Sequence, residues 1–562
     1  MIALYAIVKL TFKSVLRSHI FQILLALLLF TIIALPVTLV GDGTALAQIQ
    51  ISLQYCLGAV SFILSLSTIW LSCFAMSNDI ETYQIHMLIS KPVSRVTIWF
   101  GKALGILIIH TFLLFLSAGL IYILILCQFK DRMFLRYVEW PLGIIMVLSG
   151  VVLIFSAGIW INKLSQKFFK LKTSKRGHRV YSNSTFLLKT TVISFAVLII
   201  AFLSFFAMNW QFDRNTFSLL ARDKIRNEVL VGRRVYMPQL PDMKKRVGEV
   251  YGEMVKNLPA NRRNIPAAKK REIRNNIYKQ LILRRGEVRA GSSKFWSYKG
   301  LDPHLSAPVF LRYRAYVGKV SSEEQRETYG LWGARFFIPV NPSDKKSGKS
   351  GGVKAAFGSL TPGSVKIMGG VFNETILPPD IISSKGESII GFTNFDPQRK
   401  TIFFQKNDGP QLLVKVTGFI ENYIRGIFII FLKLLLLTGF SCAIGGLFSA
   451  SVAIFSVISY LLVGVFSTYL INFENEMIDM GGPPPVQSIQ DIIGGITSKG
   501  SMLFIIPMQN FEISSLLSGG ELIEYAMIGK LILFNLLLKG IPFIILGIFL
   551  YQRREMGLVI KK

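Results

Sequence analysis

The stretch Asn78–Gly105, NDIETYQIHMLISKPVSRVTIWFGKALG, separates two long apolar runs and decides how this chain is organised. It opens with two acids, Asp79 and Glu81, and continues as a short amphipathic run that has Leu88 and Ile89 on one side. The pattern predicts a polar loop that leaves a membrane and returns to it. Part of this loop is expected to form a short helix along the membrane surface.

The second half of the loop carries the signals that return the chain to the membrane. Pro92 ends the amphipathic run, because the residue before a proline is disfavoured in the α region. A new helix is expected to begin at Ser94-Arg95, and Lys102 marks the level at which it enters the membrane. A short helix held between two spans is a mechanical handle, because a soluble protein that grips it can move both spans. Residues 78–100 are therefore a candidate interaction site.

The order of residues in this loop resembles a known family. Glu81-x-x-x-x-x-x-Leu88, then Pro92-Val93-Ser94-Arg95, then Gly101-Lys102, is similar to the first cytoplasmic loop of ABC-2 type transporter permeases. In that family the loop docks into a cleft of a separate ATPase subunit, which binds the ATP, and two permease chains form the working unit. The resemblance implies an ATPase-coupling loop made of Asp79, Glu81, Leu88, Ile89, Pro92, Arg95 and Lys102. An ordinary polar loop is the alternative.

Composition places the whole chain in a membrane. Of its 562 residues, 51% are hydrophobic and only 17% are charged, which is typical of a polytopic membrane protein. The formal net charge of +31 would suggest nucleic acid for a soluble protein. Here the membrane surface and the excess of bases in cytoplasmic loops explain part of it, and no nucleic-acid partner is expected. The cysteines and histidines are scattered, so neither a disulfide framework nor a metal site is indicated.

Eight apolar runs are long enough to span, at about 20 residues each. They lie near 20–40, 53–75, 103–127, 141–161, 190–208, 426–447, 452–471 and 526–550. The two runs between 426 and 471 are separated only by a turn expected at Ser449-Ala450-Ser451, which has no charge. The fold class expected is therefore an α-helical polytopic membrane protein with five spans in 1–208 and three in 426–562.

The Lys/Arg bias orients these spans. The segment 162–189 is basic and has no acid, so it should be cytoplasmic, whereas the acidic segment 472–525 should be external. Eight spans then put both termini in the cytoplasm of a multi-pass protein, which we expect in the inner (cytoplasmic) membrane. The same parity puts 209–425 outside, although bases outnumber acids there roughly two to one. Long domains cross largely regardless of charge, so the external placement is kept.

Residues 209–425 are predicted to form an inserted α+β domain. Helical stretches are expected around 242–257 and 266–285. Alternating runs then predict strands at 309–316, 335–340, 365–372, 387–393, 400–405 and 411–418. Short strands with frequent turn signals are typical of a β-sandwich, here in the C-terminal half of the domain.

Residues 2–19 are predicted to form an interfacial helix before the first span, as permeases of this family usually begin. Lys9, Lys13 and Arg17 fall on one helical face, and Leu4, Val8, Phe12 and Val15 on another. A basic flank that only orients the first span is the alternative.

Two lysines inside the apolar runs, Lys433 and Lys539, are candidates for an intramembrane functional charge, because burying a charge in a bilayer is costly. His110 and Lys530 are weaker candidates. The run Leu517–Glu521, LSGGE, resembles the signature of ABC ATPases, but no phosphate-binding loop accompanies it. We interpret it as a turn or helix cap, and expect no ATPase site and no enzymatic activity in this chain.

The leading interpretation is thus an ABC-2 permease subunit, an exporter driven by a separate ATPase subunit, with a second permease chain and membrane lipid as further partners and no cofactor of its own. A membrane-anchored envelope-binding or scaffold protein, whose external β domain acts without transport, is the alternative from another class. A polytopic membrane enzyme would need a polar cluster that the sequence does not display.

Overall fold

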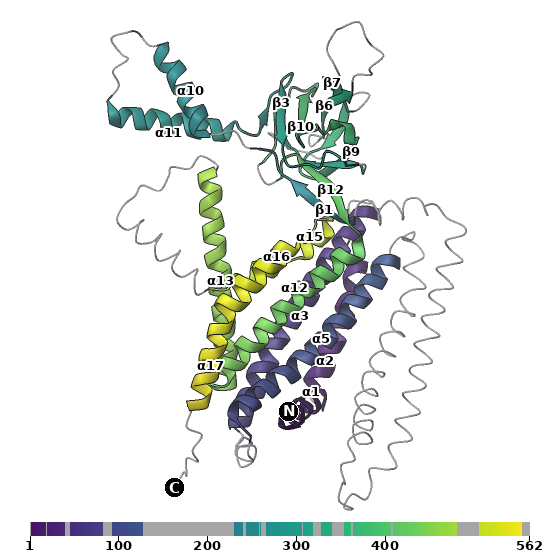
Figure 1. The fold of residues 1–562 in the computed structure, drawn as a ribbon, viewed down its shortest axis with the longest axis vertical. Helices are drawn as coiled ribbons and strands as arrows, with labels where there is room; N and C mark the ends of the chain where they lie inside the picture. The colour runs from purple at the N-terminus through teal and green to yellow at the C-terminus, as the bar shows by residue number, and fades with distance from the viewer. Residues whose placement is uncertain are drawn as a thin grey trace, which may run out of the picture. The chain divides into compact units, whose positions relative to one another are not determined.

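The computed structural model describes residues 2–17, 19–39, 45–81, 93–127, 230–239, 243–257, 259, 266–305, 307–317, 327–339, 353–360, 364–405, 408–479 and 505–553. The chain divides into two compact units. One comprises residues 1–231, 418–467 and 500–562, and the other comprises 232–417 with 468–499. We call them the membrane unit and the β domain, and describe each by itself (Figure 1).

The membrane unit is helical. Its helices are α1 (Ile2–Arg17), α2 (His19–Thr38), α3 (Ala45–Glu81), α5 (Arg95–Cys127), α12 (Phe419–Gly445), α13 (Ala450–Asp479), η6 (Met508–Phe511), α15 (Ser514–Ser518), α16 (Tyr525–Lys530), η7 (Leu531–Gly540) and α17 (Ile541–Arg553). Five described helices are long and apolar enough to cross a membrane, namely Ile49–Glu81, Arg95–Tyr122, Phe419–Gly445, Ala450–Tyr469 and Tyr525–Arg553. The first expected span appears as the shorter apolar helix Ile23–Pro36 within α2. The expected spans at 141–161 and 190–208 lie outside the described residues.

The helix α12 lies at the centre of the membrane unit and packs against α3, α5 and α17 (Figure 1). Glycines make these contacts close. A Cβ added to Gly445 would stand 2.8 Å from Cα of Cys73 on α3, and one added to Gly547 on α17 would stand 2.3 Å from Cβ of Ala443. Small residues let helices approach inside a membrane, where dispersion contacts rather than water exclusion hold them together. The expected break between two spans is also present, because α12 ends at Gly445 and α13 begins at Ala450.

The helix α1 packs on α5 through two glycines one helical turn apart. A Cβ at Gly101 would stand 2.7 Å from Ile7, and one at Gly105 would stand 2.9 Å from Thr11. Both Ile7 and Thr11 are buried, while Lys13 on the opposite face is exposed. Residues 2–17 thus form the predicted helix, but its apolar face contacts protein as well as whatever lipid lies beside it.

The last long helix changes its hydrogen-bonding pattern midway. Residues Tyr525–Arg553 form one continuous helix, of which Leu531–Gly540 is π-helical. Pro542 follows this segment and has no N–H to donate to the carbonyl of Leu538, so an α-helical bond is missing there in any case. Wide π-turns inside α-helices are rare and frequently lie at functional sites.

The β domain contains two helices and twelve described strands. The two predicted helices are present as α10 (Met243–Lys256) and α11 (Ala267–Leu283), and they pack on each other as a hairpin. The strands are β1 (Gly232–Tyr236), β2 (Glu287–Val288), β3 (Ser293–Tyr298), β4 (Val309–Arg314), β5 (Tyr316–Val317), β6 (Glu327–Pro339), β7 (Val353–Ser359), β8 (Val365–Met368), β9 (Phe372–Leu377), β10 (Ser388–Asn394), β11 (Ile402–Phe403) and β12 (Gln411–Thr417). They form antiparallel sheets in the orders β1-β12-β4-β9, β3-β10-β6-β7 with β8 beside β6, and β2-β11-β5.

Both larger sheets contribute side chains to one hydrophobic core, as expected of the strand-rich half of the domain. Trp332 on β6 is fully buried at its centre, with ring centroids 4.7 Å from Tyr313 and 4.8 Å from Phe392. Gly330 makes room for this cluster, because a Cβ there would stand 2.1 Å from Cζ of Phe392. Glycine at this position therefore allows three aromatic rings to share the core.

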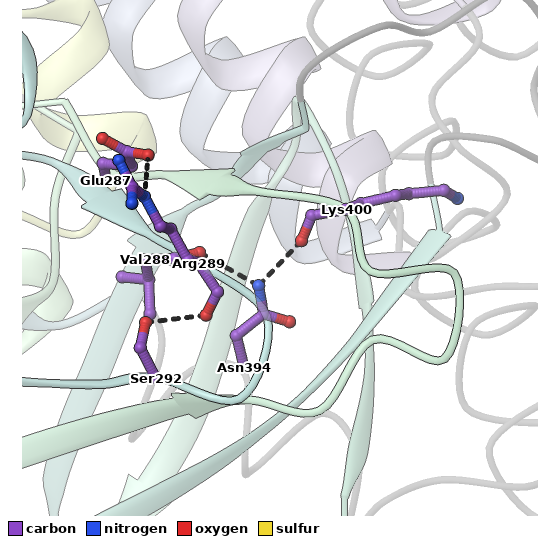
Figure 2. A network of polar contacts seen from close by, with 6 residues as sticks. All are labelled: Glu287, Val288, Arg289, Ser292, Asn394 and Lys400. Carbon is purple, nitrogen blue, oxygen red and sulfur yellow. Dashed lines mark hydrogen bonds and ion pairs between the residues drawn. The ribbon is translucent and has the colours of Figure 1, made fainter.

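A buried amide joins the loops at one edge of the domain (Figure 2). Asn394 at the end of β10 donates to the carbonyls of Val288, at 3.0 Å, and Lys400, at 2.8 Å. Ser292, in the turn before β3, donates to the carbonyl of Arg289 at 2.7 Å. A fully buried Asn needs such partners, and here they fix the β2–β3 turn against the β10–β11 connection.

We expect Gly330→Ala to lower the stability of the β domain, because overpacking a well-filled core typically costs about 1–3 kcal/mol. The control is Gly248→Ala in α10, where an added Cβ meets nothing within 4 Å. That change should leave stability equal or raise it by up to about 1 kcal/mol through helix propensity. Thermal unfolding of the full chain in detergent measures both. Equal melting temperatures for Gly330→Ala and the wild type would contradict the core assignment.

Candidate functional site

The candidate interaction loop, residues 78–100, joins α3 to α5. Asp79 and Glu81 lie in the last turn of α3, and Arg95 is the first residue of α5. The hydroxyl of Ser94 accepts a hydrogen bond from the N–H of Thr97 at 3.2 Å, which caps α5 where the sequence predicted its start. The remaining residues of the predicted coupling loop, Leu88, Ile89 and Pro92, lie outside the described residues.

Lys102 and Asp79 form an ion pair between α5 and α3. The side chain of Lys102 is only 7% exposed, and its ammonium also donates to the carbonyl of Ala75 at 2.5 Å. Lys102 therefore holds the two helices together inside the protein. The buried ammonium needs a counter-charge here, because little water reaches it.

The end of α3 is also bound to the turn between α12 and α13. The carboxylate of Glu81 accepts a hydrogen bond from the N–H of Ala450 at 3.2 Å and so caps the start of α13, where a negative charge is favourable. The hydroxyl of Ser77 lies 2.9 Å from the carbonyl oxygens of both Gly445 and Phe448. Side chains of α3 thus provide hydrogen-bond partners for backbone groups at the end of α12 and the start of α13 that have none within their own helices.

The start of α5 is bound to the end of α17. A guanidinium nitrogen of Arg95 donates to the carbonyl of Gln552 at 2.6 Å, where a cation suits the negative end of the helix dipole. Glu81 and Arg95, which flank segment 82–92, thus contact different parts of the C-terminal membrane helices.

Asp79→Asn should destabilise the membrane unit by about 3–5 kcal/mol, because it leaves the ammonium of Lys102 buried and unpaired. The double variant Asp79→Asn with Lys102→Met removes both charges and should recover most of that loss. Thermal unfolding in neutral detergent compares the two. A double variant no more stable than Asp79→Asn would show that the pair is not the source of the effect.

A second polar site lies in the interior of the helices. Lys433 on α12 donates to the hydroxyl of Ser61 on α3 at 3.1 Å, and both residues are buried. The negative charge of Glu512 acts on Lys433 from an exposed position, where its carboxylate accepts a hydrogen bond from Ser514 at 2.7 Å. Lys433 lies 14 residues, about 21 Å, from the start of the 27-residue helix α12, and so near the middle of a helix long enough to span a membrane. A charge at that depth is a candidate functional group, and Glu512 is the acid that the sequence did not connect with it.

Glu512 belongs to residues 505–518, which contact α12, α13 and the last long helix. The carbonyl of Ile505 accepts a hydrogen bond from Lys539 at 2.8 Å, and the N–H of Ile506 donates to the hydroxyl of Tyr460 at 3.0 Å. A Cβ on Gly464 would stand 3.2 Å from Ile505. Non-helical backbone at membrane depth needs partners from the protein, and Lys539 and Tyr460 provide them. Lys539, predicted as a functional charge, therefore also has a structural role.

The segment continues over α12 as η6 and α15. A Cβ on Gly426 would stand 2.6 Å from Leu517 and 2.8 Å from Ile513. Gly426 is seven residues, about 10 Å, into α12. The LSGGE run forms the end of α15 and a turn in which Gly520 has a φ of 65°, as interpreted from the sequence. The short helices η6 and α15 thus precede the last span and pack among the spans.

Sequence reasoning missed the polar cluster at the first turns of α12. Arg425 donates to the carbonyl of Ile523 at 3.0 Å, pairs with Glu421 and stands 3.9 Å from the centroid of the Tyr525 ring. Asn422 is fully buried and bonds to the backbone after α15 from both ends of its amide. The spacing of Glu421 and Arg425 was a visible signal, since charges four residues apart share a helix face. His110, a weaker candidate from the sequence, has a hydrogen-bond partner for each ring nitrogen. Its Nε2 lies 3.0 Å from the hydroxyl of Ser67 and its Nδ1 lies 2.9 Å from the carbonyl of Ile106.

Comparison with protein-family models, curated proteins and solved structures finds no match to this chain. The fold itself defines the class as a helical membrane protein with an inserted strand-rich domain. Its candidate sites are the two loop ends that hold the C-terminal helices and the interior site at Lys433.

We expect Tyr460→Phe to destabilise the membrane unit by about 1–3 kcal/mol, because the N–H of Ile506 loses its acceptor in a place that water does not replace. Tyr55→Phe is the matched control, since Tyr55 lies on α3 with its side chain 52% exposed. Thermal unfolding in detergent measures the difference. Equal melting temperatures for the two variants would mean that residues 505–507 are not held in the bundle by this bond.

Proposed function

We propose that this chain is the membrane-spanning subunit of an ABC-2 type transporter, an exporter whose ATPase is a separate protein that binds residues 78–100. The observation that carries the proposal is the attachment of the two helix ends that flank segment 82–92 to the C-terminal helices, by Glu81 at Ala450 and by Arg95 at Gln552. A loop with these contacts is suited to passing motion from a soluble partner to the helices.

The mechanism follows from what each contact joins. An ATPase that closes on ATP and pulls or pushes segment 82–92 displaces the ends of α3 and α5 together, because Asp79 and Lys102 pair them. Glu81 and Ser77 then carry the displacement to the α12–α13 turn, and Arg95 carries it to α17. ATP binding shifts the conformation only as far as the loop's contacts with the ATPase differ between the two states.

The helix motion would also displace the polar residues around Lys433. Lys433, Ser61 and Glu512 come from α12, α3 and the segment before α15. We assign them to the substrate path, with Lys433 as the charge that meets a passing polar group. In this proposal the chain lies in the inner (cytoplasmic) membrane with both termini in the cytoplasm, and two such chains form the transporter.

The alternative, an envelope-binding or scaffold protein, accounts for the β domain. It gives no role to the buried charge of Lys433 or to the contacts of Glu81 and Arg95. Those contacts favour transport over anchoring, because an anchor needs no pathway of coupled helices.

The experiment is affinity purification of the full-length chain from its native membranes in a mild detergent, with peptide mass spectrometry and vanadate-sensitive ATP hydrolysis as readouts. We expect an ABC ATPase to co-purify. Leu88→Asp with Glu81→Lys should lower its capture by about thirtyfold, because losing a buried apolar anchor costs about 2 kcal/mol or more and the new lysine adds repulsion. Leu88→Ala and Ile89→Ala should weaken capture more than Arg95→Ala, since anchors outweigh rim charges.

Two variants make this result specific. Glu81→Gln keeps an oxygen for the N–H of Ala450 and so tests the charge apart from the helix cap. Glu249→Lys makes the same charge change as Glu81→Lys on the exposed face of α10 and should leave capture unchanged. Full capture and full ATP turnover in the Leu88→Asp, Glu81→Lys variant would refute the coupling role of this loop.

A further inference from the structure

Three cations converge where the α10–α11 hairpin joins the sheets of the β domain. They are Arg246 on α10, Arg285 in the turn after α11, and Lys294 on β3. The ammonium of Lys294 donates to the backbone carbonyl of Arg285. Burial, together with the charges of Arg246 and Arg285, lowers the pKa of Lys294 to about 8. Like charges held this close repel one another, and the fold keeps them together nonetheless.

One nearby acid acts on this cluster, and it already has a partner. Among the described residues, Glu287 is the carboxylate that offsets the repulsion on Lys294. Its carboxylate accepts a hydrogen bond from Nε of Arg289 at 2.8 Å, as Figure 2 shows. The three cations at the base of the hairpin therefore share the carboxylate of Glu287 with a fourth cation, Arg289. The positive charge of the cluster is not neutralised by the side chains described around it.

An open hydrogen-bond donor lies in the same place. Nη2 of Arg285 is buried and has no hydrogen-bond partner among the described residues. A buried donor on a charged group is costly to leave unpaired. A solvated surface would not explain this atom, because it is out of contact with solvent. An acceptor supplied by a bound group would.

We infer that Arg246, Arg285 and Lys294 form a binding site for a phosphate group. A guanidinium matches phosphate oxygens in a fixed geometry, and an ammonium adds a point charge. A phosphate here accepts from Nη2 of Arg285 and relieves the repulsion around Lys294. The hairpin adds a field that attracts anions, since Met243–Arg285 contains thirteen Lys or Arg against three Glu. This site does not depend on the transport proposal.

The phosphate has two possible sources, a free phosphate or phosphomonoester and the headgroup of an acidic lipid. The full-length chain in a neutral maltoside detergent and phosphate-free buffer is titrated calorimetrically with inorganic phosphate and, separately, with dihexanoyl phosphatidylglycerol below its micelle concentration. Saturable binding of either supports the site. Binding of the lipid assigns it to a headgroup, and binding of inorganic phosphate alone assigns it to a free phosphate or monoester.

Arg285→Gln should weaken that binding by about tenfold, the value of one charge-assisted hydrogen bond. Arg246→Gln is a second variant on an exposed residue, and it tests the site even if Arg285→Gln perturbs folding. Lys299→Gln is the matched control, because Lys299 follows the same strand, is 53% exposed and pairs with Glu387 instead. Its affinity should equal the wild type. No binding of either probe, or equal affinity in Arg246→Gln, Lys299→Gln and the wild type, would overturn the inference.

Discussion

A charge or an open backbone group inside a bilayer must find its partner within the protein, and the arrangement of the membrane unit follows from that constraint. Lys433 reaches Ser61, Lys539 reaches the carbonyl of Ile505, and Lys102 reaches Asp79. Each contact joins segments that are far apart in the sequence or belong to different helices. The bonds that satisfy these groups therefore also set which helices touch and at what height.

The same constraint explains why residues 505–518 lie among the helices. Their backbone is only partly helical, so it needs donors and acceptors that lipid does not offer. Tyr460 and Lys539 provide them from two different helices. Asn422 does the same for the backbone of Glu521 and Ile523, which follows. Gly426 and Gly464 leave the space for close approach. Polar side chains and glycines at matching heights thus hold this segment against the helices, while the side chain of Glu512 stays exposed.

Local patterns predicted the parts of the fold that depend on neighbours in sequence. The two helices of the hairpin and the six predicted strand runs overlap observed elements, because Gly, Pro and alternating side chains mark them, whereas β2, β3, β7 and β9 had no prediction of their own. The expected strand 335–340 is longer in the structure, from Glu327 to Pro339, since Gly330 and Gly333 interrupt the alternation. The strand β1 was missed because two arginines dominate its five residues, and its pairing partner β12 lies almost 200 residues away. Partners at such distances leave no local trace.

The candidate sites show the same division. The loop 78–100 was found from its sequence because acids, an apolar pair and a proline follow one another there. The internal partners of Glu81 and Arg95 could not be predicted, because Ala450 and Gln552 contribute only backbone atoms that any residue would offer. Likewise Lys433 was recognised as an intramembrane charge, but Glu512 is 79 residues further on and carries no motif that connects it.

Helix geometry connects the two candidate sites. Ser77 and Ser61 are 16 residues apart on α3, about 24 Å, and Gly445 and Lys433 are 12 residues apart on α12, about 18 Å. Ser77 contacts Gly445 at the loop end, and Lys433 contacts Ser61 in the interior, so the same two helices make both contacts. Helices of this length behave as stiff rods, so a tilt of α3 against α12 at the loop end also moves Ser61 relative to Lys433. The 3.1 Å hydrogen bond between Lys433 and Ser61 is lost when the two groups move apart by up to about 1 Å. The close contact of Gly445 with Cys73 can serve as the pivot of this tilt. In the proposed transporter, small movements of the loop would therefore be enough to free the charge of Lys433 for a substrate.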